Sequence, residues 1–490
     1  MIRTRIPPSP TGYLHMGNAR TALFNYLFTK KNNGRLILRI EDTDRERSTE
    51  EFEKDIIDEL KWLQITWNEG PYRQSERLKI YGKYLDKLIE ENKAYYCFCT
   101  EEELEAERQY QMSQGLAPKY SGKCSSITRE DAEKRLKKEK AVVRFRNNEK
   151  KVEFDDLIRG HIEFNTELTG DFVIAKDLNT PLYNFAVVID DYEMKITHVI
   201  RGEDHLSNTP KQILMQKALG FETPFYGHLP LILGSDRSKL SKRHGAASVK
   251  HFREQGYLKE SLINFLAFLG WNPGTDKEIY SIESLINDFS LEKVQKGGAV
   301  FNIEKLNSLN SYYIKNKDIK ELTELCIPYL VKSNLIEEKW GRHKAKETGE
   351  GIDMKTLMKI VSLYKERMKK LSDISELTDY FFKNLKYDKE MLKWKEMDDR
   401  EVLQSLSHSE KILKEIPDKD FTEENLMKIL TSGAEMFAKS FTSSQDRGYL
   451  LWPLRVALTA KKASASPFEV MFVLGKEKTL ERLNNAKKIF

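Results

Sequence analysis

A nearly continuous apolar run at residues 36–40, Leu-Ile-Leu-Arg-Ile, constrains the fold of this chain most strongly. Such runs are typical of parallel strands that are buried on both faces. A helical pattern occupies residues 17–30 before the run, and another begins after it, where Ser48 and Glu51 have the spacing of a capping box. This alternation of strand and helix predicts a doubly wound α/β domain with a parallel sheet.

The alternation is then interrupted. Residues 85–184 contain a cluster of cysteines and mixed strand signals, and apolar runs that predict buried strands return at 185–189 and 196–200. We therefore expect one α/β domain that is split between residues 1–84 and 185–235, with an inserted α+β module between its halves.

Helical patterns dominate the last third of the chain. From about residue 320 the strand signals fade, and one apolar stripe recurs at helical spacing, at Leu357, Val361, Tyr364, Met368 and Leu371. We expect residues 236–320 to lead from the α/β domain to an all-α region at residues 321–490.

The bulk composition excludes several classes of protein. The hydrophobic fraction is 40% and the charged fraction 32%, as in globular proteins, and no apolar stretch is long enough to span a bilayer. The N-terminus has no apolar signal region, so we expect a cytoplasmic protein without membrane contact. A net charge of +5 permits RNA binding but does not require it.

Two loops carry residues suited to phosphate binding. His15 and Gly17 stand between a strand and a helix N-terminus, where free N–H groups attract anions. Residues 234–245 place Lys239 and Lys242 among further cations in a glycine-bounded loop. Taken singly, the first loop is also compatible with a structural turn and the second with a solvated surface. The chain contains neither GxGxxG nor GxxxxGK[ST], which disfavours dinucleotide and P-loop sites.

Together the two loops resemble the HIGH and KMSKS signatures of class I aminoacyl-tRNA synthetases. Nearly the whole chain resembles the bacterial-type glutamyl-tRNA synthetases, on motifs at residues 5–12, 39–44, 69–72, 183–185 and 199–205. Glutaminyl relatives typically read Pro-Glu-Pro-Asn where this chain reads Pro-Ser-Pro-Thr, and their anticodon region is a β-barrel.

The resemblance implies a Rossmann-type catalytic domain that activates glutamate with ATP and Mg²⁺. His15, Lys239 and Lys242 would act on the phosphates, and the adenylate would pass to the 2′-hydroxyl of the terminal ribose of tRNA(Glu). By resemblance the ATP site also includes Thr11, Gly17 and Asp204. The glutamate site would contain Arg5, Ser9, Glu41, Tyr183 and Arg201.

The resemblance also assigns the remaining segments. The inserted module would bind the acceptor end of tRNA, residues 236–320 its stem and residues 321–490 its anticodon. Adenylate formation would itself need bound tRNA. We expect the protein to act as a monomer.

The chemistry of glutamate supports the proposed amino-acid site independently. A glutamate pocket must neutralise two carboxylates and one ammonium, which two arginines and one carboxylate can do. Arg5, Glu41 and Arg201 fall at strand ends or just beyond them, where ligands bind in open α/β sheets. Each arginine alone would more often be a surface ion pair.

Cys97, Cys99 and Cys124 lie in the inserted module. Three thiolates suit a structural Zn²⁺ site, which needs four ligands. Some family members carry a histidine where this chain has Ser126, and Tyr120 is the best substitute ligand nearby. The alternative is a module with reduced thiols and no metal.

Three other functions fit part of the pattern. A small-molecule nucleotidyltransferase would have no task for the helical C-terminal region. A shortened relative that glutamylates a modified tRNA base lacks that region. A non-catalytic RNA-binding paralogue would be expected to have lost His15, Lys239 or Lys242, and this chain retains all three.

Overall fold

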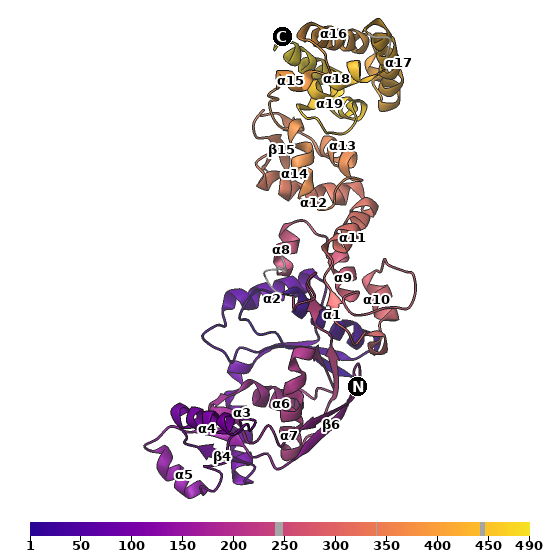
Figure 1. Cartoon of the computed structure of the whole chain (residues 1–490). Coiled ribbons are helices and arrows are strands. Elements are labelled where there is room, and N and C mark those ends of the chain that lie inside the picture. The colour runs from indigo at the N-terminus through magenta and orange to yellow at the C-terminus, as the bar shows by residue number, and fades with distance from the viewer. Residues whose placement is uncertain (241–247, 340, 442–445) are drawn as a thin grey trace. The chain divides into compact units, whose positions relative to one another are not determined.

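The computed structural model describes residues 1–240, 248–339, 341–441 and 446–490. The chain divides into two units, one formed by residues 1–254 and 259–309 and the other by residues 255–258 and 310–490 (Figure 1). Among the helices of these described residues, none combines the length and apolar character that crossing a bilayer would require.

The first unit begins with a three-stranded parallel sheet of order β1-β2-β3. Its elements are β1 (Arg3–Ile6), α1 (Met16–Lys31), β2 (Arg35–Ile40), α2 (Glu50–Trp62) and β3 (Glu69–Arg73). The strand predicted at residues 36–40 and the helix predicted at 17–30 are therefore confirmed. All residues of β2 after Arg35 are buried, as the apolar run predicted.

The capping box predicted from Ser48 and Glu51 is wrong, because the N-cap of α2 is Thr49 and the residue three positions later is Phe52. Thr49 is the N-cap, and its hydroxyl accepts a hydrogen bond from the backbone N–H of Phe52 at 3.2 Å. The backbone N–H groups of Ser48 and Thr49 are both hydrogen-bonded, to Asp44 O and Pro10 O respectively.

The strand predicted at residues 185–189 is also wrong, because this apolar run lies in helix α6 (Tyr183–Glu193). A short apolar run has no periodicity that separates a buried strand from a buried helix. Here every residue from Phe185 to Asp191 is buried, so the helix shows no polar face along this stretch. The strand predicted at 196–200 is confirmed as β10 (His198–Gly202), shifted by two residues.

The second half of the α/β domain restores the parallel pattern. β10 pairs in parallel with β11 (Phe225–Leu229), and α7 (Thr209–Leu219) connects the two strands. Next to β10, the backbone N–H of Thr197 donates to Arg3 O at 3.0 Å. The two halves of the domain thus meet along β1 and β10, although almost two hundred residues separate them in sequence.

Between the halves lies a mixed segment. It forms a four-stranded antiparallel sheet of order β4-β5-β8-β9, and a separate hairpin of β6 and β7 joins β11. The elements are α3 (Leu78–Glu90), β4 (Ala94–Cys97), α4 (Glu101–Ser113), α5 (Arg129–Leu136), β5 (Val142–Phe145), β6 (Lys151–Asp156), β7 (Gly160–Asn165), β8 (Phe172–Asp177) and β9 (Thr180–Pro181).

Short elements complete the first unit. They are β12 (Ile232–Leu233), α8 (Val249–Glu254), α9 (Lys259–Ala267), α10 (Ile282–Asp288) and β13 (Ala299–Val300), which pairs with β12. Helix α11 (Ile303–Asn316) runs from the first unit into the second. Short 3₁₀ turns occur at Gln74–Glu76, Glu203–Asn208, Leu291–Lys293, Asp379–Phe381 and Asp418–Asp420.

The second unit is mainly helical, as predicted. Its helices are α12 (Ile319–Lys332), α13 (Met354–Tyr364), α14 (Asp373–Thr378), α15 (Lys389–Leu392), α16 (Asp399–Glu415), α17 (Glu423–Phe441), α18 (Gly448–Thr459) and α19 (Pro467–Lys487). All five residues of the predicted stripe are buried, although α13 ends before Met368.

One feature of the second unit departs from the all-α expectation. A small antiparallel sheet interrupts the helices, formed by β14 (Ile336–Lys339), β15 (Arg342–Ala345) and β16 (Gly351–Ile352). Its strands have two to four residues and many charged side chains, so their apolar periodicity was too weak to detect.

Candidate active site

His15 caps the N-terminus of α1. Its Nδ1 accepts a hydrogen bond from the backbone N–H of Asn18 at 3.3 Å, which leaves Nε2 as the nitrogen that carries hydrogen. A Cβ atom at Gly17 would lie 3.2 Å from ring atoms Cε1 and Nδ1 of His15. Glycine at this position therefore leaves room for the imidazole, in addition to the room it offers a ligand at the helix end.

The imidazole of His15 is neutral at neutral pH. Desolvation by surrounding protein lowers its pKa, and this effect exceeds the opposing attraction of Asp204, while Lys239 lowers the pKa further. Asp204 and Lys239 are thus within electrostatic range of His15. The structure brings together these three members of the predicted ATP site, while Thr11 lies exposed in the preceding loop.

The second loop begins and returns close to His15. Lys239 Nζ lies 3.5 Å from Asp204 Oδ2. After the loop, Ser248 forms an antiparallel bridge with His15, and the backbone N–H of Val249 donates to Leu14 O at 2.8 Å. Lys242, the third predicted catalytic residue, lies outside the described residues.

Arg5 and Arg201 form the cationic part of the predicted glutamate site, and both are buried. Arg5 Nε donates to Asp191 Oδ1 at 3.2 Å, and Arg201 Nε and Nη2 donate to His228 and Thr209. Nη1 of each guanidinium is buried and has no hydrogen-bond partner among the described residues.

Glu41 and Tyr183 lie within electrostatic range of these arginines. Burial raises the pKa of Glu41, against the attraction of Arg39 and Arg5. Burial also raises the pKa of Tyr183 to about 12, with Glu41 raising it and Arg201 and Arg5 lowering it. The structure therefore places four of the five predicted glutamate-site residues in one cluster.

Ser9, the fifth predicted residue, contacts the cluster through the backbone. Its hydroxyl donates to Glu41 O at 2.8 Å, and the backbone N–H of Glu41 donates to Pro8 O at 2.9 Å. These two bonds hold the proline-rich loop against the end of β2.

Sequence reasoning missed Arg39, Asp190 and Asp191. Arg39 is fully buried and donates to Asp191 Oδ1 at 2.7 Å and to Glu41 Oε1 at 3.0 Å. Asp190 accepts hydrogen bonds from Gln74, Arg77 and Tyr81. A signal was present in the sequence, because charged residues that interrupt or end an apolar run are rarely buried without a partner.

This arrangement suits an anionic ligand that also carries an ammonium group. Leaving a buried N–H unpaired costs about 1–3 kcal/mol, which a carboxylate bound at either Nη1 would recover. Glu41 supplies a nearby carboxylate for an ammonium group. The cluster can therefore bind an amino acid whose side chain is also acidic.

His205 lies beside this cluster and provides a test by pH. Its Nδ1 is 3.2 Å from the Tyr183 hydroxyl, and burial, with Arg201 and Arg5, lowers the pKa of His205 to about 4. Below pH 6.5 the unfolded chain takes up a proton that the folded chain does not, so stability falls as pH falls from 6.5 towards 4.

We expect His205→Asn to remove this contribution. From pH 7.5 to pH 5 the free energy of unfolding of the wild type should fall by about 2 kcal/mol more than that of the variant. Urea unfolding at both pH values measures the difference, and the pH 7.5 values provide the reference in which His205 is neutral in both states. Parallel pH dependences would contradict the assignment.

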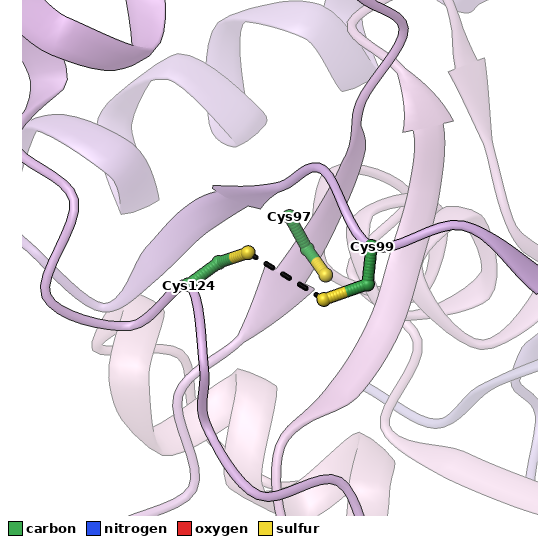
Figure 2. Close-up of side chains that lie close together, drawn as sticks. All are labelled: Cys97, Cys99 and Cys124. Carbon is green, nitrogen blue, oxygen red and sulfur yellow. Dashed lines mark hydrogen bonds between the residues drawn. The ribbon is translucent and has the colours of Figure 1, made fainter. Parts of the chain in front are cut away.

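The cysteine cluster is a candidate metal centre (Figure 2). The sulfur atoms of Cys97, Cys99 and Cys124 lie within 4.8 Å of one another, and Cys99 and Cys124 are 3.6 Å apart. The Tyr120 hydroxyl lies 3.4 Å from Cys97 Sγ and 3.5 Å from Cys99 Sγ. Ser126 is exposed.

The separations of Cys99 from Cys124, and of the Tyr120 hydroxyl from Cys97 and Cys99, are close to the edges of one tetrahedral ion. Zinc bonds of about 2.3 Å to sulfur and about 2.0 Å to oxygen require edges of about 3.8 Å between sulfurs and about 3.5 Å between sulfur and oxygen. Hydrogen bonds with Tyr120 and Arg144 lower the pKa of the Cys97 thiol against the effect of burial, whereas burial raises the pKa of Cys99 to about 11. The cluster could therefore hold a metal.

Known proteins match this chain over nearly its whole length. The family described as tRNA synthetases class I (E and Q), catalytic domain, matches residues 1–308, and the family described as anticodon binding domain matches residues 321–487. The chain is 48% identical to glutamate–tRNA ligase 1 of Caldicellulosiruptor saccharolyticus over 98% of each chain. It is 46% identical to glutamate–tRNA ligase of Carboxydothermus hydrogenoformans over 99% of each chain.

A solved structure is similar over the same extent. The crystal structure of a glutamate tRNA ligase from Elizabethkingia meningosepticum, in complex with its amino acid, matches 99% of each chain with a TM-score of 0.85 and 33% identity. Both the split parallel sheet and the helical C-terminal part fall within this match. The chain therefore belongs to the glutamate–tRNA ligase family of the class I aminoacyl-tRNA synthetases.

Proposed function

We propose that this chain activates L-glutamate with ATP and transfers the glutamyl group to the terminal ribose 2′-hydroxyl of tRNA(Glu), releasing AMP and pyrophosphate. The observation that carries the proposal is the pair of unpaired Nη1 atoms on buried Arg5 and Arg201, close to Glu41. The two guanidinium groups bind the two carboxylates of glutamate, and Glu41 with Tyr183 receives its ammonium group.

The phosphates of ATP, which enters with Mg²⁺, bind between the two loops. The glutamate α-carboxylate attacks the α-phosphate in line, and His15, Lys239 and Lys242 stabilise the charge that develops as pyrophosphate leaves. Thr11, Gly17 and Asp204 complete the ATP site. The neutral Nε2–H of His15 and the closeness of Lys239 to Asp204 support this assignment. Positioning and electrostatics carry the reaction, so no residue needs to become covalently bound.

The other segments bind tRNA. Residues 1–84 and 185–235 form the catalytic domain, and residues 85–184 bind the acceptor end. Residues 236–320 contact the stem and residues 321–490 bind the anticodon. The protein acts as a monomer. The match of residues 321–487 to an anticodon binding domain supports the last assignment.

One assay tests the proposal. The protein is incubated with ATP, labelled glutamate or glutamine, and total tRNA, and charged tRNA is measured. We expect glutamate on tRNA(Glu) only when ATP is present. Label on a modified base, transfer without tRNA, or no activity would each favour one of the three rival functions and contradict this one.

We also propose that the cysteine cluster binds one structural Zn²⁺ through Cys97, Cys99, Cys124 and Tyr120. Bound zinc would hold the strand end at Cys97 and the loop at Cys124 in one orientation. The separation of Cys99 from Cys124, and those of the Tyr120 hydroxyl from Cys97 and Cys99, support the proposal.

The zinc assignment predicts the result of a conservative substitution. Tyr120→Phe keeps the ring, over which Arg144 is stacked at 4.0 Å, and removes the ligand oxygen. We expect the wild type to retain about one zinc ion per chain after dialysis, and the variant to bind zinc about tenfold or more weakly in chelator competition. Tyr110→Phe, at an exposed tyrosine of the same segment, is the matched control. A wild type without zinc would contradict the proposal.

A further inference from the structure

The hairpin of β6, which is labelled in Figure 1, and β7 belongs to a four-stranded sheet of order β10-β11-β6-β7, and β6 ends in a buried acid. Asp156, the last residue of β6, lies opposite Tyr226 of β11, and the backbone N–H of Leu157 donates to Tyr226 O at 2.8 Å. The following turn packs on Gly227, where an added Cβ would meet Ile158 at 3.6 Å. A strand that lies between the two catalytic halves in sequence thus joins the sheet of β10 and β11.

The carboxylate of Asp156 determines the hydrogen position on His228. Asp156 Oδ1 accepts the backbone N–H groups of Ile158 and Arg159, both at 2.9 Å. Asp156 Oδ2 accepts from the backbone N–H of His228 at 3.1 Å and from its ring Nδ1 at 2.6 Å. Both side chains are fully buried. Burial lowers the pKa of His228, so the ring is neutral with its hydrogen on Nδ1.

With hydrogen on Nδ1, the other ring nitrogen of His228 is an acceptor. Arg201 Nε lies 3.2 Å and Thr209 Oγ1 3.0 Å from His228 Nε2, and Arg201 Nη2 donates to Thr209 Oγ1 at 2.7 Å. His228 and Thr209 therefore hold two nitrogens of Arg201 and leave Nη1 without a partner among the described residues. The opposite tautomer would point an N–H at the N–H of Arg201 Nε.

We propose that Asp156 is a positioning residue for glutamate binding, because it holds His228 in the tautomer that orients Arg201. This inference rests on the proposed function, in which Arg201 binds a glutamate carboxylate. It makes the amino-acid site depend on the inserted segment, since a residue of β6 acts two hydrogen bonds away from Arg201. The Asp156 side chain is fully buried and acts through His228.

Asp156→Asn tests the proposal with little change in shape. The new amide keeps an oxygen for the turn at Ile158 and Arg159, but its NH₂ group faces His228 Nδ1. The ring hydrogen of His228 must then move to Nε2, where it faces the N–H of Arg201 Nε. We expect KM for glutamate to rise by about tenfold to a hundredfold and KM for ATP to stay within about twofold, in aminoacylation at saturating tRNA.

The matched control is Asp155→Asn, which removes the same charge from the neighbouring, exposed position on β6. It should leave both KM values unchanged. His228→Leu is the second variant, because it removes the acceptor for Arg201 and leaves Asp156 bonded to the turn. In the His228→Leu background, Asp156→Asn should change KM for glutamate by less than about twofold, since no tautomer remains to be set.

Nitrogen NMR of ¹⁵N-histidine-labelled protein measures the tautomer of His228 directly, without need of activity. We expect the hydrogen on Nδ1 in the wild type and on Nε2 in Asp156→Asn. A tautomer that does not change, or an inverted tautomer with an unchanged KM for glutamate, overturns this inference and leaves the proposed function intact. A wild type that does not charge tRNA with glutamate overturns the proposed function, and with it the role of Arg201.

Discussion

Replacing Arg201 by methionine is expected to lower kcat/KM for glutamate by about a hundredfold to a thousandfold, with KM for ATP nearly unchanged. Removing one partner of a buried, hydrogen-bonded charge pair costs about 2–5 kcal/mol, and each 1.4 kcal/mol is a factor of ten. Arg201 is 4% exposed, so water cannot replace its guanidinium beside a bound carboxylate. Steady-state aminoacylation with varied glutamate and then varied ATP measures both constants.

The same substitution should not unfold the protein. No ion pair of Arg201 is found within the described part of the chain, and burial lowers the pKa of its guanidinium. The buried charge therefore lowers the stability of the folded protein. Thr209 can still donate to His228 in the variant. We expect the melting temperature of Arg201→Met to equal or exceed that of the wild type.

Arg39→Met provides the contrasting variant. Arg39 pairs with Glu41, Asp190 and Asp191 in the interior, so its loss leaves carboxylates without their partner and should destabilise the fold by about 3–5 kcal/mol. If Arg201→Met unfolded like Arg39→Met, or if it retained normal kcat/KM for glutamate, Arg201 would not be a ligand-binding residue.

Replacing His15 by asparagine is expected to lower kcat about a hundredfold to a thousandfold while leaving KM for glutamate close to its wild-type value. Losing one well-placed donor to developing charge has an effect of this size. The structure supplies the donor, because Asn18 N–H occupies Nδ1 and leaves the hydrogen on Nε2. ATP–pyrophosphate exchange in the presence of tRNA measures the activation step.

Asparagine separates catalysis from helix capping. His15 is the N-cap of α1, and asparagine is among the best N-cap residues, so the melting temperature of His15→Asn should stay near the wild-type value. His15→Ala should lose both the donor and the cap, and be less stable by about 1 kcal/mol. Near-normal exchange in the stable asparagine variant would show that His15 does not act on the phosphates.

Much of the candidate site follows from patterns that are local in sequence. A loop between a strand and a helix predicts an anion site at the helix end, and His15 and Gly17 lie there. The ends of parallel strands predict ligand contacts, and Arg5, Glu41 and Arg201 lie at or beside such ends. The cysteine spacing similarly predicts a cluster, which the structure forms.

Local sequence patterns did not predict several other features of the fold. The run at residues 185–189 is equally apolar in a strand and in a helix that is buried on every side, so its helical form depends on what packs around it. Arg39 interrupts an otherwise apolar strand, and the sequence does not show which groups pair with it. Its three carboxylate partners lie next to it only in the folded protein. Ser48 and Thr49 are both good N-cap residues, so residue type alone does not decide that Thr49 caps α2.

Residue types and their spacing, together with the resemblance to the synthetase family, are therefore enough to propose the two loops, the two arginines and the acid of the candidate site. They cannot tell which guanidinium atoms remain free for a ligand. That depends on partners distant in sequence: Asp156 and His228 are 72 residues apart, and Arg5 and Asp191 are 186 apart. Such pairs form only when β6 meets β11 and the two halves of the domain close, because long-range register is set by packing of the whole domain rather than by neighbouring residues.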